Sequence, residues 1–254
     1  MKKLMVLLLG LIFASFLFTA CSGDDTTAAP ETKYSISGKI ADANGTGVAN
    51  VSVNLSGAAT NSVASGTDGS YKFENLNKGD YTVAPQSGDY DFNPDSIGLT
   101  DLATNNGDND FIAIGVYGTW VSEGGNIAPL LAGPPFNVAK LTATFNTNRS
   151  YTVVQMDTSG ASIELNGTFT IEKSSFLIGG TTIFNIVLDQ ATPAVLTATG
   201  IFQIDMNVSP FTMQYEVVQT TPDIGIAPPT AEDGFGSTGG GAFGMLNVQK
   251  YVRQ

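Results

Sequence analysis

The sequence predicts an all-β protein with two domains, a β-sandwich followed by an antiparallel β-barrel. Short runs in which apolar and polar residues alternate are separated by turn-forming residues, and no segment beyond residue 21 shows a helical period. The 254 residues include 29 glycines, which suits a chain with many turns. About 230 residues remain without the N-terminal signal described next, enough for two small β-domains or one large one.

Residues 1–20 have the organisation of an export signal. Lys2 and Lys3 precede an apolar stretch over residues 4–18. This stretch is about half as long as a membrane-spanning helix, so we interpret it as a removable signal peptide.

Cys21 is the only cysteine of the chain and directly follows this signal. The run Leu17-Phe18-Thr19-Ala20-Cys21 resembles a bacterial lipobox, although Phe18 stands where leucine is usual. The resemblance implies that Cys21 is acylated, for instance with palmitate. Cys21 would then begin a lipoprotein of the outer membrane, either periplasmic or surface-exposed. An ordinary cleaved signal and an uncleaved anchor helix are the alternatives, but a free thiol is unusual in an exported protein.

Residues 21–32 are small, polar and contain a proline, so we expect them to form an acylated, flexible tether. Alternation begins directly afterwards, where Tyr34, Ile36 and Ile40 are separated by polar residues. Further alternating runs with intervening turns continue to residue 114. We therefore expect a β-sandwich over residues 33–114.

Four phrases of this region are distinctive. They are Ser37-Gly38-Lys39-Ile40, Gly47-Val48-Ala49-Asn50-Val51-Ser52-Val53, Thr67-Asp68-Gly69-Ser70-Tyr71-Lys72-Phe73 and Gly79-Asp80-Tyr81-Thr82-Val83. Together they resemble the carboxypeptidase regulatory-like domain. The resemblance implies a prealbumin-like, seven-stranded sandwich, a fold that is also grouped with carbohydrate-binding modules. It says little about function, because each phrase is a strand or a turn and not a ligand contact.

The segment over residues 100–110 is predicted to be a polar bridge between the domains. It is crowded with oxygen-bearing side chains, which are Asp101, Asn105, Asn106, Asp108 and Asp110. A calcium ion would relieve their mutual repulsion, but the spacing fits no EF-hand loop. We therefore expect a solvated linker and no metal site, with calcium as the alternative.

Eight alternating runs follow, which predicts an eight-stranded antiparallel barrel over residues 115–254. Closure would remove the exposed strand edges, and a second sandwich is the alternative. The runs are 119–123, 140–145, 150–157, 162–172, 181–188, 194–204, 211–218 and 245–252. The glycine-rich segment over residues 234–244 is expected to be a long surface loop.

The first of these runs contains Gly118-Thr119-Trp120, with the only tryptophan of the chain. This phrase resembles the opening of lipocalin-like domains. The resemblance implies that an arginine near the last strand covers the tryptophan, a place that Arg253 can occupy. Other lipocalin motifs are absent from the sequence.

Composition excludes several classes of function. The chain has no histidine, which removes serine–histidine and cysteine–histidine catalysis and imidazole metal sites. Loss of Lys2 and Lys3 with the signal changes the formal net charge from −12 to −14. A mature protein with this negative charge is repelled by phosphate backbones, so nucleic acid is not an expected partner. We expect no enzyme activity, no catalytic residue and no cofactor.

Carboxylate chemistry survives these exclusions, since Asp89 with Asp91, or Glu164 with Glu172, could be a glycosidase pair. Sequence cannot place such a pair across a cleft, so glycan hydrolysis is only a third hypothesis. Most aromatic residues fall at core positions of the runs. The loop aromatics that alternation does not assign to a core are candidates for stacking on sugar rings. They are Tyr90, Phe92, Phe136, Phe235 and Phe243.

The expected function is that of an envelope-anchored lipoprotein acting as a non-enzymatic binding or structural module. Its acyl chains would bind the membrane, and its sandwich would bind carbohydrate. The alternative is a carrier whose barrel holds a small hydrophobic ligand. That alternative predicts a cavity lined by Leu141, Phe145, Ile163, Phe169 and Ile183. The ligand and its contact residues are unknown from the sequence.

Overall fold

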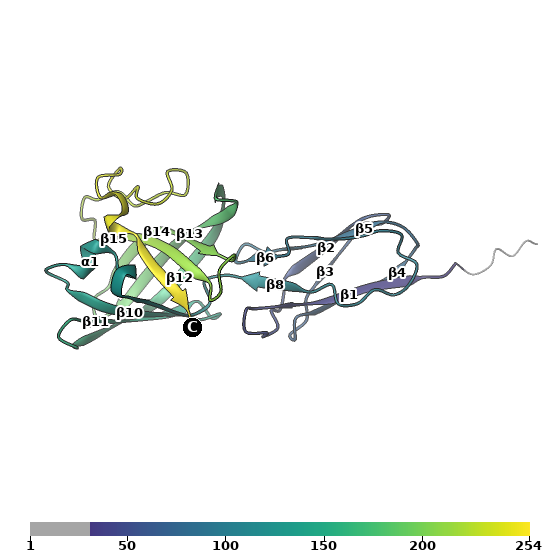
Figure 1. Cartoon of the computed structure of the whole chain (residues 1–254), viewed down its shortest axis with the longest axis horizontal. Helices are drawn as coiled ribbons and strands as arrows, with labels where there is room; N and C mark the ends of the chain where they lie inside the picture. The colour runs from purple at the N-terminus through teal and green to yellow at the C-terminus, as the bar shows by residue number, and fades with distance from the viewer. Residues whose placement is uncertain (1–30) are drawn as a thin grey trace, which may run out of the picture. The chain divides into compact units, whose positions relative to one another are not determined.

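Strands dominate the computed structural model, which describes residues 31–254 (Figure 1). They form two four-stranded sheets followed by a closed eight-stranded barrel, so the all-β prediction is confirmed. Residues 33–254 form one compact unit. The predicted signal peptide and Cys21 lie outside the described residues.

The two sheets pack face to face as the predicted sandwich. One has the order β4-β1-β8-β6, with bounds Ser70–Leu76, Tyr34–Ala41, Phe111–Ile114 and Asp91–Asn93. The other has the order β3-β2-β5-β7, with bounds Asn61–Ala64, Ser52–Gly57, Tyr81–Gln86 and Ile97–Leu99. The described residues thus contain eight sandwich strands where seven were expected, and β6 and β7 have only three residues each.

The core of the sandwich forms because inward residues of both sheets meet. Ile36, Val53 and Val83 are fully buried, and Phe73 is 1% exposed. These residues occupy alternate positions of their strands, as the two-residue period requires. The alternation seen in the sequence therefore locates this core correctly.

The prediction of a polar bridge over residues 100–110 is wrong. The segment runs along β1 and belongs to the sandwich, because Ser37 N donates to Asn106 O and Asn106 N donates to Ser35 O, both at 2.9 Å. Asn109 is buried, and its amide donates to Ser37 O at 2.9 Å. The polar side chains complete an edge of the sheet and satisfy its backbone groups, which a sequence pattern does not reveal.

Each of the eight predicted runs of the second domain contains a barrel strand, although residues 245–247 of the last run lie in a short helix. The strands are β9 Gly118–Glu123, β10 Val138–Phe145, β11 Ser150–Asp157, β12 Ser162–Ile178, β13 Thr181–Thr192, β14 Leu196–Asp205, β15 Thr212–Thr221 and β16 Gln249–Arg253. Each pairs antiparallel with the next, and β16 closes the barrel on β9. Short helices η1 (Gly124–Asn126), α1 (Pro129–Ala132) and η2 (Gly244–Asn247) lie at one end.

Residues 222–243 form a strap that crosses the outside of the barrel between β15 and η2. Ala231 and Phe235 of the strap pack on Ile183 and Ile201, which face outward from β13 and β14. The strap contains most of the glycine-rich segment that was expected to be a surface loop. This segment is anchored to the barrel, and Thr238 within it is only 2% exposed.

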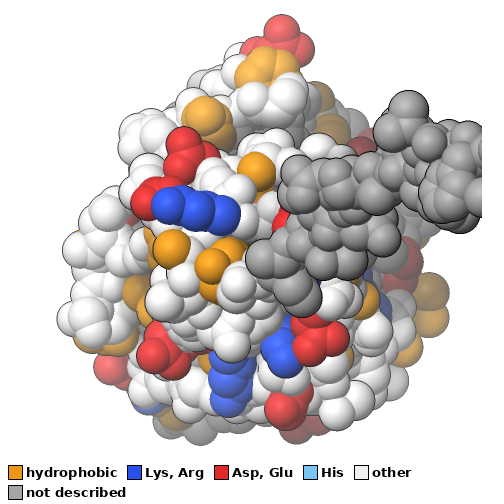
Figure 2. Space-filling view, turned by 90° about the vertical axis from the view of Figure 1, so that its right-hand side faces the viewer, with side chains coloured by type: hydrophobic (Ala, Val, Ile, Leu, Met, Phe, Trp, Pro, Cys, Tyr) orange, Lys and Arg blue, Asp and Glu red, His pale blue; other side chains and the backbone are white. Residues whose placement is uncertain are grey.

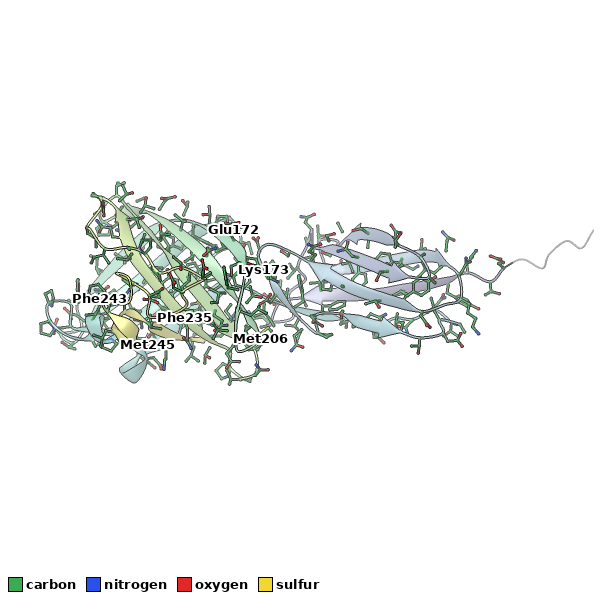
Figure 3. The ribbon with its side chains drawn as sticks, turned by 90° about the horizontal axis from the view of Figure 1, so that it is seen from above. Glu172, Lys173, Met206, Phe235, Phe243 and Met245 are labelled. Atoms are coloured by element: carbon green, nitrogen blue, oxygen red, sulfur yellow. The ribbon has the colours of Figure 1, made fainter. Side chains whose placement is uncertain are left out.

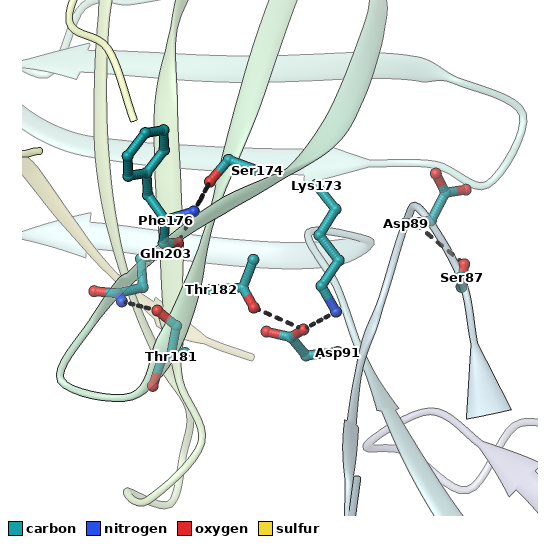
Figure 4. A network of polar contacts seen from close by, with 9 residues as sticks. All are labelled: Ser87, Asp89, Asp91, Lys173, Ser174, Phe176, Thr181, Thr182 and Gln203. Carbon is teal, nitrogen blue, oxygen red and sulfur yellow. Dashed lines mark hydrogen bonds and ion pairs between the residues drawn. The ribbon is translucent and has the colours of Figure 1, made fainter. Parts of the chain in front are cut away.

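Two ion pairs join the sandwich to one end of the barrel. Asp89 contacts Arg149 at 2.7 Å, between the Oδ2 and Nη2 atoms. Asp91 contacts Lys173 at 2.5 Å and accepts a hydrogen bond from Thr182 Oγ1 at 3.0 Å (Figure 4). Asp89 and Asp91 of the sandwich therefore help to hold it against this end of the barrel.

Charged side chains of both signs lie near one another on the face drawn in Figure 2, with hydrophobic ones scattered between them. The sandwich carries two exposed ion pairs, Lys72 with Glu74 and Lys78 with Asp101. No helix in the described part of the chain is both long and apolar enough to span a membrane.

Candidate functional site in the barrel

A cavity of about 210 Å³ lies inside the barrel. It occupies the end at which β15 finishes and β16 begins, whereas the sandwich contacts the other end through Arg149 and Lys173. The lining comes from every strand except β9, together with α1 and η2. The lining residues are Leu131, Leu141, Ala143, Phe145, Tyr151, Val153, Gln155, Leu165, Leu188, Gln190, Leu196, Ala198, Tyr215, Val217, Asn247, Gln249 and Tyr251.

The other half of the barrel interior is filled by aromatic side chains. Phe184 and Phe202 stack with their ring centroids 5.0 Å apart, and Phe145 meets Phe169 edge to face at 5.2 Å. Trp120 is fully buried in the same cluster. These rings give the cavity a rigid, apolar floor, because close-packed aromatic interiors leave little room for rearrangement.

Gln249 forms hydrogen bonds to the segment over residues 122–128, which leads from β9 to α1 beside the cavity. Its amide nitrogen donates to Ser122 Oγ and to Asn126 O, and its amide oxygen accepts from Ala128 N at 2.9 Å. One buried amide thereby ties β9 and the start of α1 to β16. A glutamine in an alternating strand has no sequence signal for this role, so sequence reasoning missed it.

Three tyrosines are among the polar residues that line the apolar cavity. Tyr151, Tyr215 and Tyr251 are buried and line it, and their hydroxyls form no hydrogen bond within the described part of the chain. The rings of Tyr215 and Tyr251 meet at right angles with centroids 5.9 Å apart. These hydroxyls are therefore available as donors and acceptors to a molecule that enters the cavity.

The surroundings keep these hydroxyls protonated. Burial raises the pKa of Tyr151 to about 12, and the charge of Asp189 adds to this effect. Burial also raises the pKa of Tyr215 and of Tyr251 well above the ordinary tyrosine value, and Tyr215 is further raised by its two tyrosine neighbours. Each phenol can therefore donate a hydrogen bond at any physiological pH.

The predicted cavity-lining residues are partly correct. Leu141 and Phe145 line the cavity, and Phe169 lies in its floor. Ile163 is wrong, because it lies at the rim of β12 and is 43% exposed. Ile183 is wrong as well, because Phe184 and Ile186 face inward and Ile183 consequently faces the strap. Asn185 and Asp189 share a face with Ile183, so alternation favours the opposite face as the inward one; the strap that covers Ile183 has no local sequence signal.

The expected cover of the tryptophan is confirmed. The Arg253 guanidinium carbon lies 5.3 Å from the centroid of the Trp120 ring. Trp120 Nε1 donates to Val116 O at 2.6 Å. Gly118 leaves room for the arginine, since a Cβ atom there would lie 2.8 Å from Arg253 Nη2.

The loop aromatics do not form a shared platform. Phe92 is buried in the sandwich core, and Tyr90 is half-buried against Tyr117 with ring centroids 5.3 Å apart. Phe235 and Phe243 are half-buried residues of the strap, and both are labelled in Figure 3. Phe136 alone is exposed, at 53%.

The proposed glycosidase pairs are occupied by structural contacts or exposed. Asp89 and Asp91 form the ion pairs with the barrel, and Glu164 accepts a hydrogen bond from Asn166 at 2.8 Å. Glu172 is exposed on the outside of β12. In the described range 31–254, no three acidic or other metal-binding side chains of the His, Cys, Asp and Glu types are grouped to hold a metal ion.

Comparison with known proteins agrees with the sandwich. Residues 35–99 match the family model of the carboxypeptidase regulatory-like domain. No curated protein matches the chain. Among solved structures, the chain is similar to a DUF3823 family protein from Parabacteroides merdae, with 10% sequence identity and a TM-score of 0.29, over 62% of this chain and 91% of that one.

Proposed function

We propose that this chain is a non-enzymatic binding protein of the bacterial envelope, and that its barrel cavity holds a small ligand. The ligand has an apolar body and at least one oxygen atom that meets the tyrosine hydroxyls. The sandwich carries the barrel, and the acylated Cys21 attaches the protein to the outer membrane.

The single observation that supports this proposal best is an apolar cavity lined by Tyr151, Tyr215 and Tyr251, whose hydroxyls form no hydrogen bond within the described residues. An apolar cavity of about 150 Å³ is large enough to bind benzene. The cavity of about 210 Å³ therefore has room for one substituted ring or a branched chain of similar size. Ligand sites commonly combine such apolar walls with a few oriented polar groups.

The sandwich supports carbohydrate binding less well. Sugar rings usually stack on exposed aromatic faces, yet every aromatic side chain in the described residues 33–114 is buried or half-buried. Its carboxylates Asp89 and Asp91 are engaged by the barrel. These contacts favour the carrier alternative and a supporting role for the sandwich.

Binding of 4-methylphenol and toluene, measured by calorimetry, tests the cavity. We expect the phenol to bind more tightly than toluene, because only the phenol can hydrogen-bond to the tyrosines. Ala198→Leu should abolish binding by filling the cavity, whereas Thr170→Leu, which adds the same side chain to the outer face of β12, should not. Equal binding by the two leucine variants would contradict the proposal. Mass spectrometry of solvent extracts from the purified protein would then identify the natural ligand.

The membrane anchor is tested by Cys21→Ser in the full-length chain. In a Gram-negative host grown with an alkyne-labelled fatty acid, the unchanged chain should carry label and sediment with outer membranes. The variant should carry no label and leave the membrane fraction, because a lost acyl anchor removes about 0.8 kcal/mol per buried methylene. An unlabelled wild-type chain would refute lipidation without affecting the cavity proposal.

A further inference from the structure

A second cleft, of about 430 Å³, lies between the sandwich and the barrel. The sandwich contributes Asp42, Thr46, Asn50 and Tyr90, and the barrel contributes Thr147 and Arg253. None of its lining residues is shared with the barrel cavity. Whatever binds here is therefore recognised independently of the proposed function.

Arg253 is an unpaired cation at this cleft. Its side chain forms no hydrogen bond or ion pair with any residue that the structure describes, and its Nε atom is buried without a partner. The guanidinium lies over the Trp120 ring. Burial lowers the pKa of the group, and the charge of Asp42 partly opposes this shift. Buried charged donors are normally satisfied, so the side chain is poised for an acceptor that enters the cleft.

The carboxylates nearby are already engaged. Asp89 accepts hydrogen bonds from Arg149 Nη2 at 2.7 Å and from Tyr117 Oη at 3.0 Å. Asp42 Oδ1 accepts from the backbone nitrogens of Asn44 and Thr46, each at 2.9 Å. The cleft thus presents an unpaired guanidinium, with a second oxygen of Asp42 available as an acceptor.

The remaining walls offer neutral hydrogen-bonding groups. The side chains of Thr46, Asn50, Tyr90 and Thr147 form no hydrogen bonds within residues 31–254. Hydroxyl and amide groups of this kind match the hydroxyls of a ligand, as the guanidinium matches a carboxylate. A volume of about 430 Å³ falls within the usual range for small-molecule sites.

We propose that this cleft binds a small carboxylate that carries several hydroxyl groups, the chemistry of a sugar acid. Its carboxylate would pair with the Arg253 guanidinium. Its hydroxyls would donate to Asp42 and exchange hydrogen bonds with Asn50, Tyr90 and Thr147. The overall negative charge of the protein disfavours anions in general, so binding depends on this local cation.

Calorimetry with D-glucuronate, D-glucose and acetate as probes tests the proposal on the full chain carrying Cys21→Ser. Glucuronate should bind. Glucose and acetate should each bind at least about tenfold more weakly, because glucose lacks the carboxylate and acetate lacks the hydroxyl groups. The affinity for glucuronate should fall as salt rises. No binding of glucuronate at about 10 mM, or equal binding of glucose, would overturn the proposal.

Variants locate the site. Arg253→Met keeps the long side chain over Trp120 but removes the charge, and should weaken glucuronate binding about tenfold or more. Lys250→Met removes a positive charge from an exposed position of the same strand and should leave binding unchanged. Tyr90→Phe keeps the ring packing but removes the hydroxyl, and it should weaken glucuronate binding severalfold. If Arg253→Met does not fold, Tyr90→Phe serves as the test of the site. Full affinity in Tyr90→Phe and in any folded Arg253→Met would overturn the assignment.

Discussion

Gly118 shows how one residue lets two distant parts of the chain meet. Its φ of +111° is unfavourable for residues with a side chain, and the missing Cβ leaves space for Arg253. Arg253 can therefore cover Trp120 and seal that end of the barrel interior. The glycine, the tryptophan and the arginine act as one unit.

Gly118→Ala should lower the free energy of unfolding more than Gly160→Ala, as measured by urea denaturation. Gly160 also has a positive φ, of +87°, but a Cβ atom there meets nothing within 4 Å. The control should cost about 1 kcal/mol from the backbone alone. The Gly118 variant should cost about 1 kcal/mol more, because Arg253 must leave the tryptophan ring. Equal losses would show that the arginine stacking contributes nothing.

Arg149 is a second residue whose backbone conformation is explained by its side chain. It has a φ of +70°, in a hairpin position that usually favours glycine or asparagine. Its side chain reaches Asp89 of the sandwich and lies 5.7 Å from the centroid of the Tyr117 ring. The domain contact therefore accounts for a residue that local turn preferences would not select.

At the scale of elements, the strap depends on one buried carboxylate. Glu216 faces outward from β15 and has no solvent exposure. Its oxygens accept hydrogen bonds from Gly236 N at 2.7 Å and from Thr238 Oγ1 at 2.6 Å. Thr238 Oγ1 also accepts from the Asn247 amide at 3.1 Å, which links the strap to a residue lining the barrel cavity.

Glu216→Ala should release the strap, because it leaves buried strap donors without an acceptor. We expect a loss of about 2–3 kcal/mol in unfolding free energy. Hydrogen exchange at the Gly236 and Thr238 amides should accelerate strongly, and proteases should cut within residues 222–243. Glu164→Ala, at an exposed position on the same barrel, should change neither measurement. Unchanged exchange in the Glu216 variant would contradict this account of the strap.

For the whole molecule, the buried tyrosines couple stability to alkaline pH. Tyrosine has an ordinary pKa of 10.0, and burial raises the value for Tyr151 to about 12 in the folded chain. The unfolded chain therefore releases this proton first as pH rises. Stability is fully present below pH 10 and is lost as pH rises towards 12.

Urea denaturation between about pH 9 and pH 11.5 should show this loss, with a slope of up to about 1.4 kcal/mol per pH unit for each such tyrosine. Tyr151→Phe should reduce this slope by up to about 1.4 kcal/mol per pH unit, the contribution of one tyrosine. Because phenylalanine keeps the ring, its effect near neutral pH should be small. An identical slope in the variant and the wild-type chain would show that Tyr151 is not responsible.

By itself, the sequence determined the β-class, the sandwich and the eight runs that became barrel strands. These features follow from two-residue alternation and turn chemistry, which are local properties of the chain. The pairing of Trp120 with Arg253 was implied by the resemblance of Gly118-Thr119-Trp120 to lipocalin-like domains. Alternation also placed Leu141 and Phe145 correctly at the cavity.

Only the tertiary structure decided that Ile183 on the outer face of β13 is covered, because the residues that pack on it come from the distant strap. It also decided that residues 100–110 complete a sheet edge and that the strap is pinned by Glu216. The cavity and the cleft depend on residues far apart in the chain, such as Tyr151 with Tyr251 and Asp42 with Arg253. Local patterns specify which way neighbouring side chains alternate, but only closure of the barrel and its contact with the sandwich bring these distant groups together.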